Sequence, residues 1–348
     1  MISFYPGPSR LDPHLEHYTR DAFQCGILSQ NHRSVAFMQL YADTLTTVRS
    51  YFNVPDDYSL YFVSSATECW EILSQELGAL KNVHLYNGAF GEKGFTINSS
   101  FHPDTVVGLP FDQEENPIVK TYAAQVIHLT QNETANGTQI SYTWLEELRN
   151  QNPSAFLTVD ATSSLGGQVL PMASADVWFA SVQKCLGLPS GMAVLICSKR
   201  MVEFCKSKKT IYYNSITQLE LHFQNQQTTH TPNVFGIYLL YRTLRARPPL
   251  KEVHTALKQQ AQQWYQLVER HYLFEPLILS PEQRSDTIIS VKGESSDIER
   301  FKNYCTEQAY IIGNGYGINK KNTFRIANFP SHQKSEIAFL QNLLTNFQ

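Results

Sequence analysis

The sequence has little of several features that mark specialised protein classes. Charged residues make up only 17% of its 348 residues, and the formal net charge is −3. It therefore lacks the basic stripe and high pI typical of nucleic-acid-binding proteins, and we expect no nucleic-acid partner. It has no run of about 18 apolar residues, so we expect no membrane span. Residues 1–10 lack a basic region followed by an apolar stretch, so we expect no signal peptide and a soluble, cytoplasmic protein.

Cysteines are also scarce, with six in the whole chain. None of them forms a CxxC pair or a tight cluster with histidines, so we expect no zinc site and no other metal. So few cysteines in so long a chain also argue against a disulfide framework. We expect reduced and mostly buried thiols.

The chain does contain short apolar runs that alternate with helix-like segments. Two such segments, 67–79 and 141–150, open on Thr67 and Ser141 and carry apolar residues at helical spacing. Strands that alternate with helices predict an α/β fold with a doubly wound, mostly parallel sheet. Such a sheet binds its ligand in the loops after the carboxyl ends of its strands. The predicted strands are 59–63, 83–86, 105–109, 124–129, 156–159, 177–180 and 193–197.

The length of the chain predicts two lobes, because a single core rarely serves 348 residues. The RARPP stretch at 245–249 breaks the alternating pattern, and a long helix-like segment follows it. We therefore predict a large domain over 1–248 and a smaller α+β domain over 249–348. The smaller domain has expected strands near 287–291 and 323–327.

Two charged residues follow predicted strands and stand among small residues. Asp160 ends an apolar strand, where a carboxylate needs a cationic or hydrogen-bonding partner. A protonated pyridine nitrogen is one such partner, and the ring then acts as an electron sink. Lys184 follows the strand 177–180 and precedes Gly187 and Gly191. Because desolvation lowers the pKa of a lysine, this position suits a Schiff-base amine, and a solvated loop lysine is the alternative.

Short motifs in the same order along most of the chain resemble the class V aminotransferases of fold type I. Within that group the chain is most similar to the phosphoserine aminotransferases. The resemblance implies a large, doubly wound, mixed but mostly parallel sheet domain and a smaller α+β C-terminal domain, with the N-terminal segment reaching the active site. The motifs lie at residues 4–9 (FYPGPS), 31–34 (NHRS), 132–137 (NETANG), 181–184 (SVQK), 230–232 (HTP) and 324–327 (FRIA).

The resemblance also implies a cofactor, pyridoxal 5′-phosphate, and the residues that hold it. Lys184 would carry it as a Schiff base and move the proton, and Asp160 would pair with the pyridine nitrogen. Thr134 would hydrogen-bond the phenolic oxygen, and Phe90 would stack on the ring unless it is a simple core aromatic. The phosphate would be bound by Ser65, Ala66, Thr67 and Gln183, and by His230 and Thr231 of a neighbouring subunit. The alternative for Thr67 is an ordinary helix N-cap. A homodimer with shared active sites follows.

For the substrate, the resemblance implies that Arg325 binds the α-carboxylate through a bidentate fork, with a structural ion pair as the alternative. The chain departs from the family in the stretch 313–322, where no His-Arg pair is present. His32 and Arg33 survive at the other family position, and Lys320 or Lys321 could add charge. We expect phosphoserine as the donor and 2-oxoglutarate as the acceptor, as in serine biosynthesis. The alternative is alanine or serine with glyoxylate or pyruvate.

Two other functions fit the resemblance less well. A class V lyase such as a cysteine desulfurase would have a histidine before the lysine and a cysteine on a mobile loop. Here Gln183 precedes the lysine, and Cys305 lies in a helix-like segment. A non-catalytic ligand-binding descendant would have no need for Lys184, Asp160 and Arg325 together. The sequence therefore favours an aminotransferase that acts on small amino and 2-oxo acids.

Overall fold

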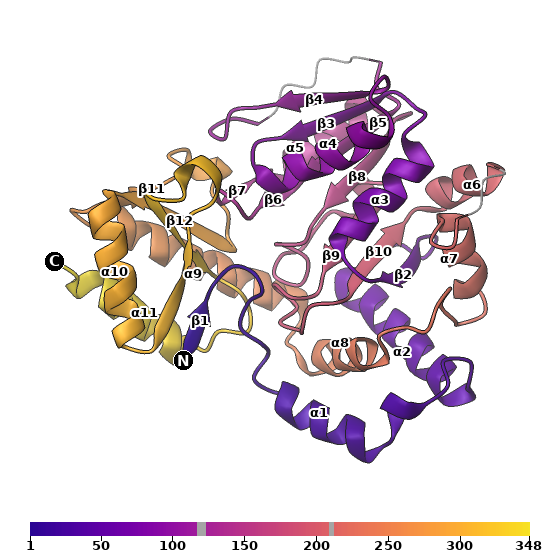
Figure 1. Ribbon diagram of the computed structural model, residues 1–348, viewed down its shortest axis with the longest axis horizontal. Helices are drawn as coiled ribbons and strands as arrows, with labels where there is room; N and C mark the ends of the chain where they lie inside the picture. The colour runs from indigo at the N-terminus through magenta and orange to yellow at the C-terminus, as the bar shows by residue number, and fades with distance from the viewer. Residues whose placement is uncertain (117–122, 209–211) are drawn as a thin grey trace.

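A computed structural model describes residues 1–116, 123–208 and 212–348. Its larger sheet has the strand order β2-β10-β9-β8-β5-β3-β4 (Figure 1). Adjacent strands are parallel except for β10, which is antiparallel to both of its neighbours. The sheet is therefore mixed but mostly parallel, and each predicted apolar run forms one of its strands. These strands are β2 (Ser59–Val63), β3 (Asn82–Tyr86), β4 (Val106–Pro110), β5 (Val126–Thr130), β8 (Phe156–Asp160), β9 (Val177–Ser181) and β10 (Ala193–Cys197).

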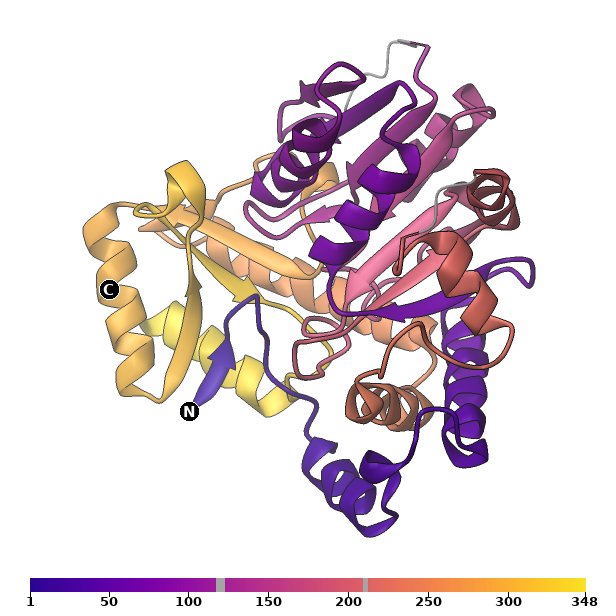
Figure 2. The same ribbon diagram turned by 45° about the vertical axis from the view of Figure 1, so that its right-hand side comes forward.

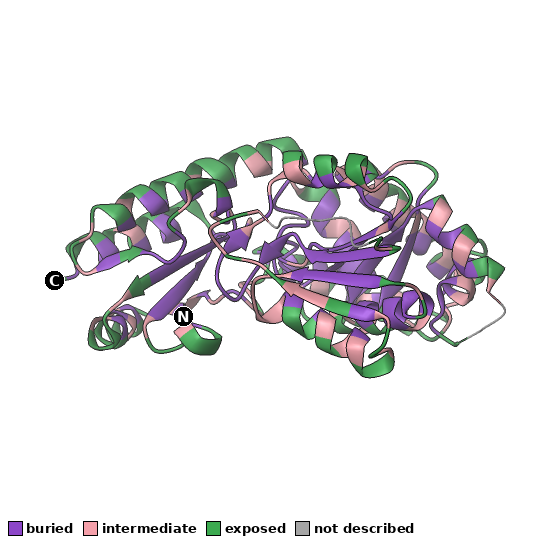
Figure 3. Cartoon of the chain, turned by 90° about the horizontal axis from the view of Figure 1, so that it is seen from above, coloured by how far each residue is buried: buried purple, intermediate pink, exposed green. Residues whose placement is uncertain are grey.

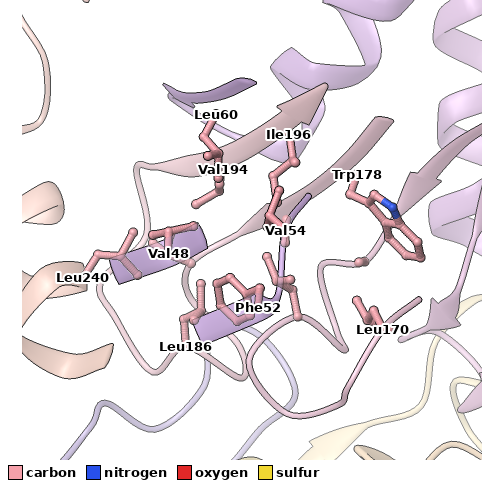
Figure 4. Packing of buried hydrophobic residues seen from close by; sticks show 14 of the residues in the cluster. Val48, Phe52, Val54, Leu60, Leu170, Trp178, Leu186, Val194, Ile196 and Leu240 are labelled. Carbon is pink, nitrogen blue, oxygen red and sulfur yellow. The ribbon is translucent and has the colours of Figure 1, made fainter. Parts of the chain in front are cut away.

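The larger sheet is covered by helices on both faces, which explains why most of its strand residues are apolar. Leu60 and Phe62 of β2 point into one core, whereas Tyr61 and Val63 point into the other. Figure 4 shows the first core, where strand side chains meet helix side chains, and Figure 3 shows the buried strands between helices with exposed outer faces. The first core is lined by α2 (Val35–Phe52), α5 (Tyr142–Gln151) and α8 (Val234–Ala246), and the second by α3 (Ala66–Leu77), α6 (Lys199–Ser207) and α7 (Ile216–Phe223).

Several of these helices begin at a serine that accepts a backbone hydrogen bond from the first turn. Such a cap stabilises a helix by about 1 kcal/mol. Helix α5 is capped by Ser141 as predicted, but α3 is capped by Ser65 rather than by Thr67, so it begins earlier than expected. Serines 34, 198 and 215 cap α2, α6 and α7 in the same way. None of the helices in the described ranges is long and apolar enough to cross a membrane.

The smaller sheet has the order β1-β13-β14-β12-β11, with β1 parallel to β13 and the other pairs antiparallel. Its first strand comes from the N-terminus, so residues 2–4 pair with a strand of the predicted smaller domain, and the predicted boundary at 248/249 stays a prediction. Figure 1 shows this strand among the orange and yellow C-terminal elements. The elements of this lobe are β1 (Ile2–Phe4), α9 (Leu250–Glu269), β11 (Phe274–Pro276), β12 (Ile288–Gly293), α10 (Ser295–Glu307), β13 (Tyr310–Asn314), β14 (Thr323–Ala327) and α11 (Lys334–Asn346).

The remaining elements lie outside the two main sheets. Figure 2 shows the indigo segment that leaves β1 and runs across to α1, which packs against α8. The chain thus passes between the lobes near its start and again near α9. These elements are α1 (Leu15–Gln24), α4 (Ala89–Phe101), β6 (Asn132–Glu133) and β7 (Thr138–Gln139).

Two histidines lie side by side inside the larger sheet, on β3 and β5. The rings of His84 and His128 stack with their centroids 4.1 Å apart, and each residue is 1% exposed. Nδ1 of His128 lies 2.6 Å from Oγ1 of Thr158, and its Nε2 lies 2.8 Å from Oδ1 of Asn82. Nε2 of His84 lies 2.9 Å from Nδ2 of Asn98. Burial lowers the pKa of His128 to about 3 and the pKa of His84 well below its ordinary value.

The neutral state of His128 predicts a stability that falls in acid. Between its ordinary pKa of about 6.5 and its folded pKa of about 3, the unfolded chain binds a proton that the folded chain does not. The contribution of neutral His128 to the free energy of unfolding is fully present above that pH window. Within the window it declines by about 1.4 kcal/mol for each pH unit of acidification. When the pH is lowered from about 7 to about 5, we expect the free energy of unfolding of a His128→Gln variant to fall by about 2 kcal/mol less than that of the wild type. Urea unfolding at both pH values measures this difference, and equal losses would contradict it.

Candidate active site

A cavity of about 290 Å³ opens where strands of the larger sheet end and the smaller lobe faces them. Thr130, Asp160 and Ser181 are the last residues of β5, β8 and β9, and all three line it. Neighbouring parallel strands bring their carboxyl ends to one edge, where α/β sheets bind ligands. Further lining comes from α3, α4, the segment 5–8 and the smaller sheet. The volume is near the lower end of the range for small-molecule sites.

Lys184 lies inside this cavity and is only 5% exposed, so the alternative of a solvated loop lysine is wrong. Its Nζ donates to Oγ1 of Thr134 (2.5 Å) and to Oγ of Ser163 (3.2 Å). It also lies 5.0 Å from the centroid of the Phe90 ring. Burial lowers the pKa of Lys184 to about 8, although the nearby carboxylates of Asp160 and Glu133 act in the opposite direction. A buried amine with this pKa is suited to nucleophilic attack on a carbonyl.

The backbone around Lys184 is held from two sides. Gly187 has φ +68° and donates its N–H to the Lys184 carbonyl (2.8 Å), which turns the chain back directly after the lysine. A Cβ at Gly187 would lie 2.1 Å from Oγ of Ser331. From the N-terminal segment, the Ser9 hydroxyl donates to the Lys184 carbonyl (3.1 Å), and a Cβ at Gly7 would lie 3.3 Å from Cε of Lys184. The N-terminal segment therefore packs directly against the lysine.

Asp160 is buried in the wall of the cavity and accepts a hydrogen bond from the Thr162 backbone N–H (2.8 Å). Burial raises the pKa of its carboxyl, while hydrogen bonds from Thr162, the positive charge of Lys184 and a hydrogen bond from Trp70 act in the opposite direction. Trp70 also lines the cavity. The sequence identified Trp70 only as an apolar residue of a predicted helix. Its position one turn after the start of α3 is the feature that could have placed it beside the cavity.

Glu133 is a buried carboxylate to which the sequence analysis gave no role. Its Oε2 accepts hydrogen bonds from the backbone N–H groups of Phe90 and Gly91 (3.1 Å each), and its Oε1 accepts one from Ala135 (2.8 Å). Burial raises the pKa of the carboxyl, and these hydrogen bonds and the charge of Lys184 oppose that effect. Glu133 therefore caps the first turn of α4 and fixes the position of Phe90. Its place in the NETANG motif was the signal that could have revealed it.

Arg325 is buried on β14 and reaches the cavity from the smaller lobe. Its Nε donates to the Asn314 carbonyl (2.7 Å), and its Nη1 donates to the Thr134 carbonyl (2.7 Å). Both partners are backbone carbonyls rather than carboxylates, so these contacts do not form the structural ion pair considered as the alternative. The ring of Tyr316 lies 5.4 Å from the guanidinium carbon. The guanidinium charge is therefore available to an anionic ligand.

The start of α3 forms another part of the wall, with Ala66 and Thr67 among the lining residues. The Ala66 N–H already donates to the Ser181 hydroxyl (2.9 Å), and the Ser65 hydroxyl accepts from the Glu68 N–H (3.1 Å). N–H groups of a first helical turn lack intrahelical acceptors, and the helix dipole favours an anion there. This end of the cavity suits a phosphate, and Gln183 also lines the cavity.

Other predicted site residues do not line the cavity of the single chain. His32 is half-buried and Arg33 is exposed, both just before α2. His230 and Thr231 lie just before α8 and are exposed. Lys320 and Lys321, on the smaller lobe, are exposed as well. The prediction placed His230 and Thr231 in the site of a neighbouring subunit, so it concerns an assembly of two chains.

Comparison with known proteins agrees with this geometry. The family Aminotransferase class-V matches residues 111–319. A phosphoserine aminotransferase of Rhodococcus opacus is 22% identical over 348 residues, which covers 96% of this chain and 91% of that one. The crystal structure of a phosphoserine aminotransferase from Cytophaga hutchinsonii is similar with a TM-score of 0.93 and 27% identity, over 99% of this chain and 98% of that one. A phosphoserine aminotransferase from Trichomonas vaginalis with bound pyridoxal phosphate has a TM-score of 0.83 and 19% identity, over 99% of both chains.

The chemistry of the cavity fits pyridoxal phosphate. Lys184 offers a buried amine to an aldehyde, Asp160 offers a carboxylate to a ring nitrogen, and the start of α3 offers N–H groups to a phosphate. The matched region covers more than half of the chain and includes both charged residues. The chain therefore belongs to the class V aminotransferase family, and pyridoxal phosphate is its cofactor.

Proposed function

We propose that this protein transfers the amino group of phosphoserine to 2-oxoglutarate, a reaction of serine biosynthesis, and works in the cytoplasm as a homodimer. The observation that carries the proposal is that Lys184 of the large lobe and Arg325 of the small lobe face one cavity. An amino acid substrate needs a cationic partner for its carboxylate and, near its amino group, the lysine that holds the cofactor. The similarity to phosphoserine aminotransferases over nearly the whole chain supports the choice of donor.

In this proposal each charged residue has a defined task. Bound pyridoxal phosphate supplies an aldehyde that takes up an amino group and a ring that accepts electron density from the α-carbon. Nζ of Lys184 holds the cofactor, then takes up the proton lost from the substrate α-carbon, and the hydroxyls of Thr134 and Ser163 orient it. Asp160 keeps the ring nitrogen protonated. Arg325 fixes the α-carboxylate through two donors.

The homodimer part of the proposal gives a task to residues outside the cavity of the single chain. His230 and Thr231 would contact the phosphate of the partner's cofactor, and His32 and Arg33 would approach the partner's substrate. Exposed apolar side chains near these residues support the proposal that a second subunit covers this surface. Val35, which directly follows the HRS segment, is exposed, and so is Tyr213, whose ring lies 6.5 Å from that of His230.

A second candidate function has its own support in the aromatic wall of the cavity. The ring of Tyr316 lies 5.5 Å from the ring of Phe90 and close to Arg325, in the loop where the family's His-Arg pair is missing. A tyrosine at this position offers a second anion a hydroxyl but no positive charge. This arrangement favours alanine or serine as the donor, with glyoxylate or pyruvate as the acceptor.

A lyase function has less support. Cys305 is fully buried in α10, and burial raises the pKa of its thiol to about 12. A buried, protonated thiol is a poor nucleophile. Sulfide release from cysteine by the purified enzyme would argue for the lyase.

The amino donor can be identified from half-reactions. Holoenzyme is mixed separately with phosphoserine, serine, alanine, glutamate and cysteine, and the visible cofactor absorption is recorded. We expect that absorption to disappear with phosphoserine and with glutamate but not with the other three. Disappearance with alanine or serine, without any change with phosphoserine, would replace the first proposal with the second.

A further inference from the structure

We propose that Lys93 is an additional ligand for the phosphate group of the cofactor. The inference rests on pyridoxal phosphate as the cofactor and is independent of which amino donor the enzyme uses. It adds a lysine side chain to a phosphate site whose other donors from the same chain are backbone N–H groups, hydroxyls and the amide of Gln183.

Helix α4 presents two residues to the cavity from one face. Phe90 and Lys93 are three residues apart, which places them on the same side of a helix, and both line the cavity. The Phe90 ring lies 5.0 Å from Nζ of Lys184. One turn further along, Nζ of Lys93 donates to Oγ1 of Thr67 (3.1 Å). The helix therefore spans the cavity from the amine that holds the cofactor to the start of α3.

The start of α3 alone is a weak partner for a phosphate dianion. A helix N-terminus carries about half a positive charge. The Ala66 N–H is occupied by the Ser181 hydroxyl, and Glu68 adds a negative charge in the same turn. Lys93 supplies a full positive charge next to Thr67. Its hydrogen-bond partner there is a hydroxyl rather than a carboxylate, so the charge remains available to an anion.

The other cations that line the described part of the cavity have different positions. Lys184 lies beside Thr134 and Ser163, and Arg325 approaches from the smaller lobe beside Tyr316. A substrate carboxylate held by Arg325 directs the substrate toward that lobe. Lys93 contacts the large-lobe helix α3, and the phosphate monoester at that end belongs to the cofactor rather than to the substrate.

The test compares cofactors with and without a phosphate. Apoenzyme is titrated with pyridoxal phosphate and with pyridoxal, and binding is followed by absorption and fluorescence. We expect Lys93→Ala to weaken pyridoxal phosphate binding roughly tenfold and to leave pyridoxal binding unchanged, because one charge-assisted contact is lost. Lys93→Arg is expected to bind nearly as the wild type. The loss is expected to shrink at high salt, because Lys93 is exposed. Lys81→Ala, which removes an exposed lysine outside the cavity, is the matched control.

Several outcomes would overturn the inference. Unchanged binding of pyridoxal phosphate to Lys93→Ala would remove Lys93 from the site. An equal loss for both compounds would show a general effect on the fold. A higher KM for phosphoserine alone, with unchanged cofactor binding, would assign Lys93 to the substrate. Failure of the wild type to bind pyridoxal phosphate would contradict the proposed function itself, which separates the two failures.

Discussion

Replacement of Lys184 by alanine is expected to abolish transamination, with a loss of more than about 10⁴-fold in kcat. Lys184 is the buried amine of the cavity, and burial lowers its pKa to about 8, so a usable fraction is neutral near physiological pH. Thr134 and Ser163 hold Nζ but carry no amine that could replace it. Steady-state kinetics with the donor identified from the half-reactions measures the loss.

The control for this variant must separate chemistry from folding. Removal of Lys184 takes one nearby positive charge away from the buried carboxylates of Asp160 and Glu133. Circular dichroism and urea unfolding therefore accompany the kinetics, and partial rescue by added small amines is expected if the lost group is the amine itself. Lys81→Ala is the matched control. Wild-type activity in Lys184→Ala would contradict the whole account.

Replacement of Arg325 by alanine is expected to lower kcat/KM about 100-fold for amino acid donors, mainly through KM. The guanidinium is buried and faces the cavity. The groups that hold it are the carbonyls of Asn314 and Thr134, and neither of these is a carboxylate. It is therefore placed to bind the substrate carboxylate in a bidentate way. Arg325→Lys keeps the charge but not the fork, so we expect it to recover only part of the activity.

A substrate without a carboxylate distinguishes binding from a structural role. The slow reaction of a simple primary amine with the holoenzyme is expected to change little in Arg325→Ala, because Arg325 has nothing to bind there. The variant also leaves the Asn314 and Thr134 carbonyls without donors, so its stability is measured in parallel. An equal loss for amines and amino acids would mean that Arg325 acts through the structure of the site.

The larger sheet could be predicted almost completely because its strands are buried on both faces. Such strands appear in a sequence as short, continuous apolar runs, as in 59–63 and 193–197, and both were found with these bounds. The strand β1 could not be predicted in this way. It has three residues, and it pairs with β13 at the far end of the chain. The N-terminus consequently belongs to the smaller sheet.

Sequence reasoning singled out charged residues that follow apolar strands and gave no role to other residues that line or border the cavity. Asp160 and Lys184 stand out because burial of a charge needs a reason. Glu133 and Trp70 do not stand out, since their importance depends on backbone N–H groups and on a carboxylate that reach them only in the folded chain. Lys93 appears in the sequence as an ordinary surface lysine on a helix.

Four residues assigned from the family resemblance lie outside the cavity of the single chain. They are His32 and Arg33, predicted to bind the substrate, and His230 and Thr231, predicted to reach the cofactor of a second subunit. Their roles stay predictions because no pattern within one chain encodes the surface that a partner will cover. Sedimentation of the holoenzyme, together with the cofactor affinity of His230→Ala, tests them.

Among the lysines of the chain, we expect Lys184 to bind pyridoxal phosphate covalently. The most direct measurement is borohydride reduction of the holoenzyme, followed by digestion and mass spectrometry of the peptides. We predict a single pyridoxyl-phosphate adduct, located on Lys184 and absent when an amino donor is added before reduction. An adduct on another lysine, or no adduct in a holoenzyme that absorbs visible light, would contradict the account.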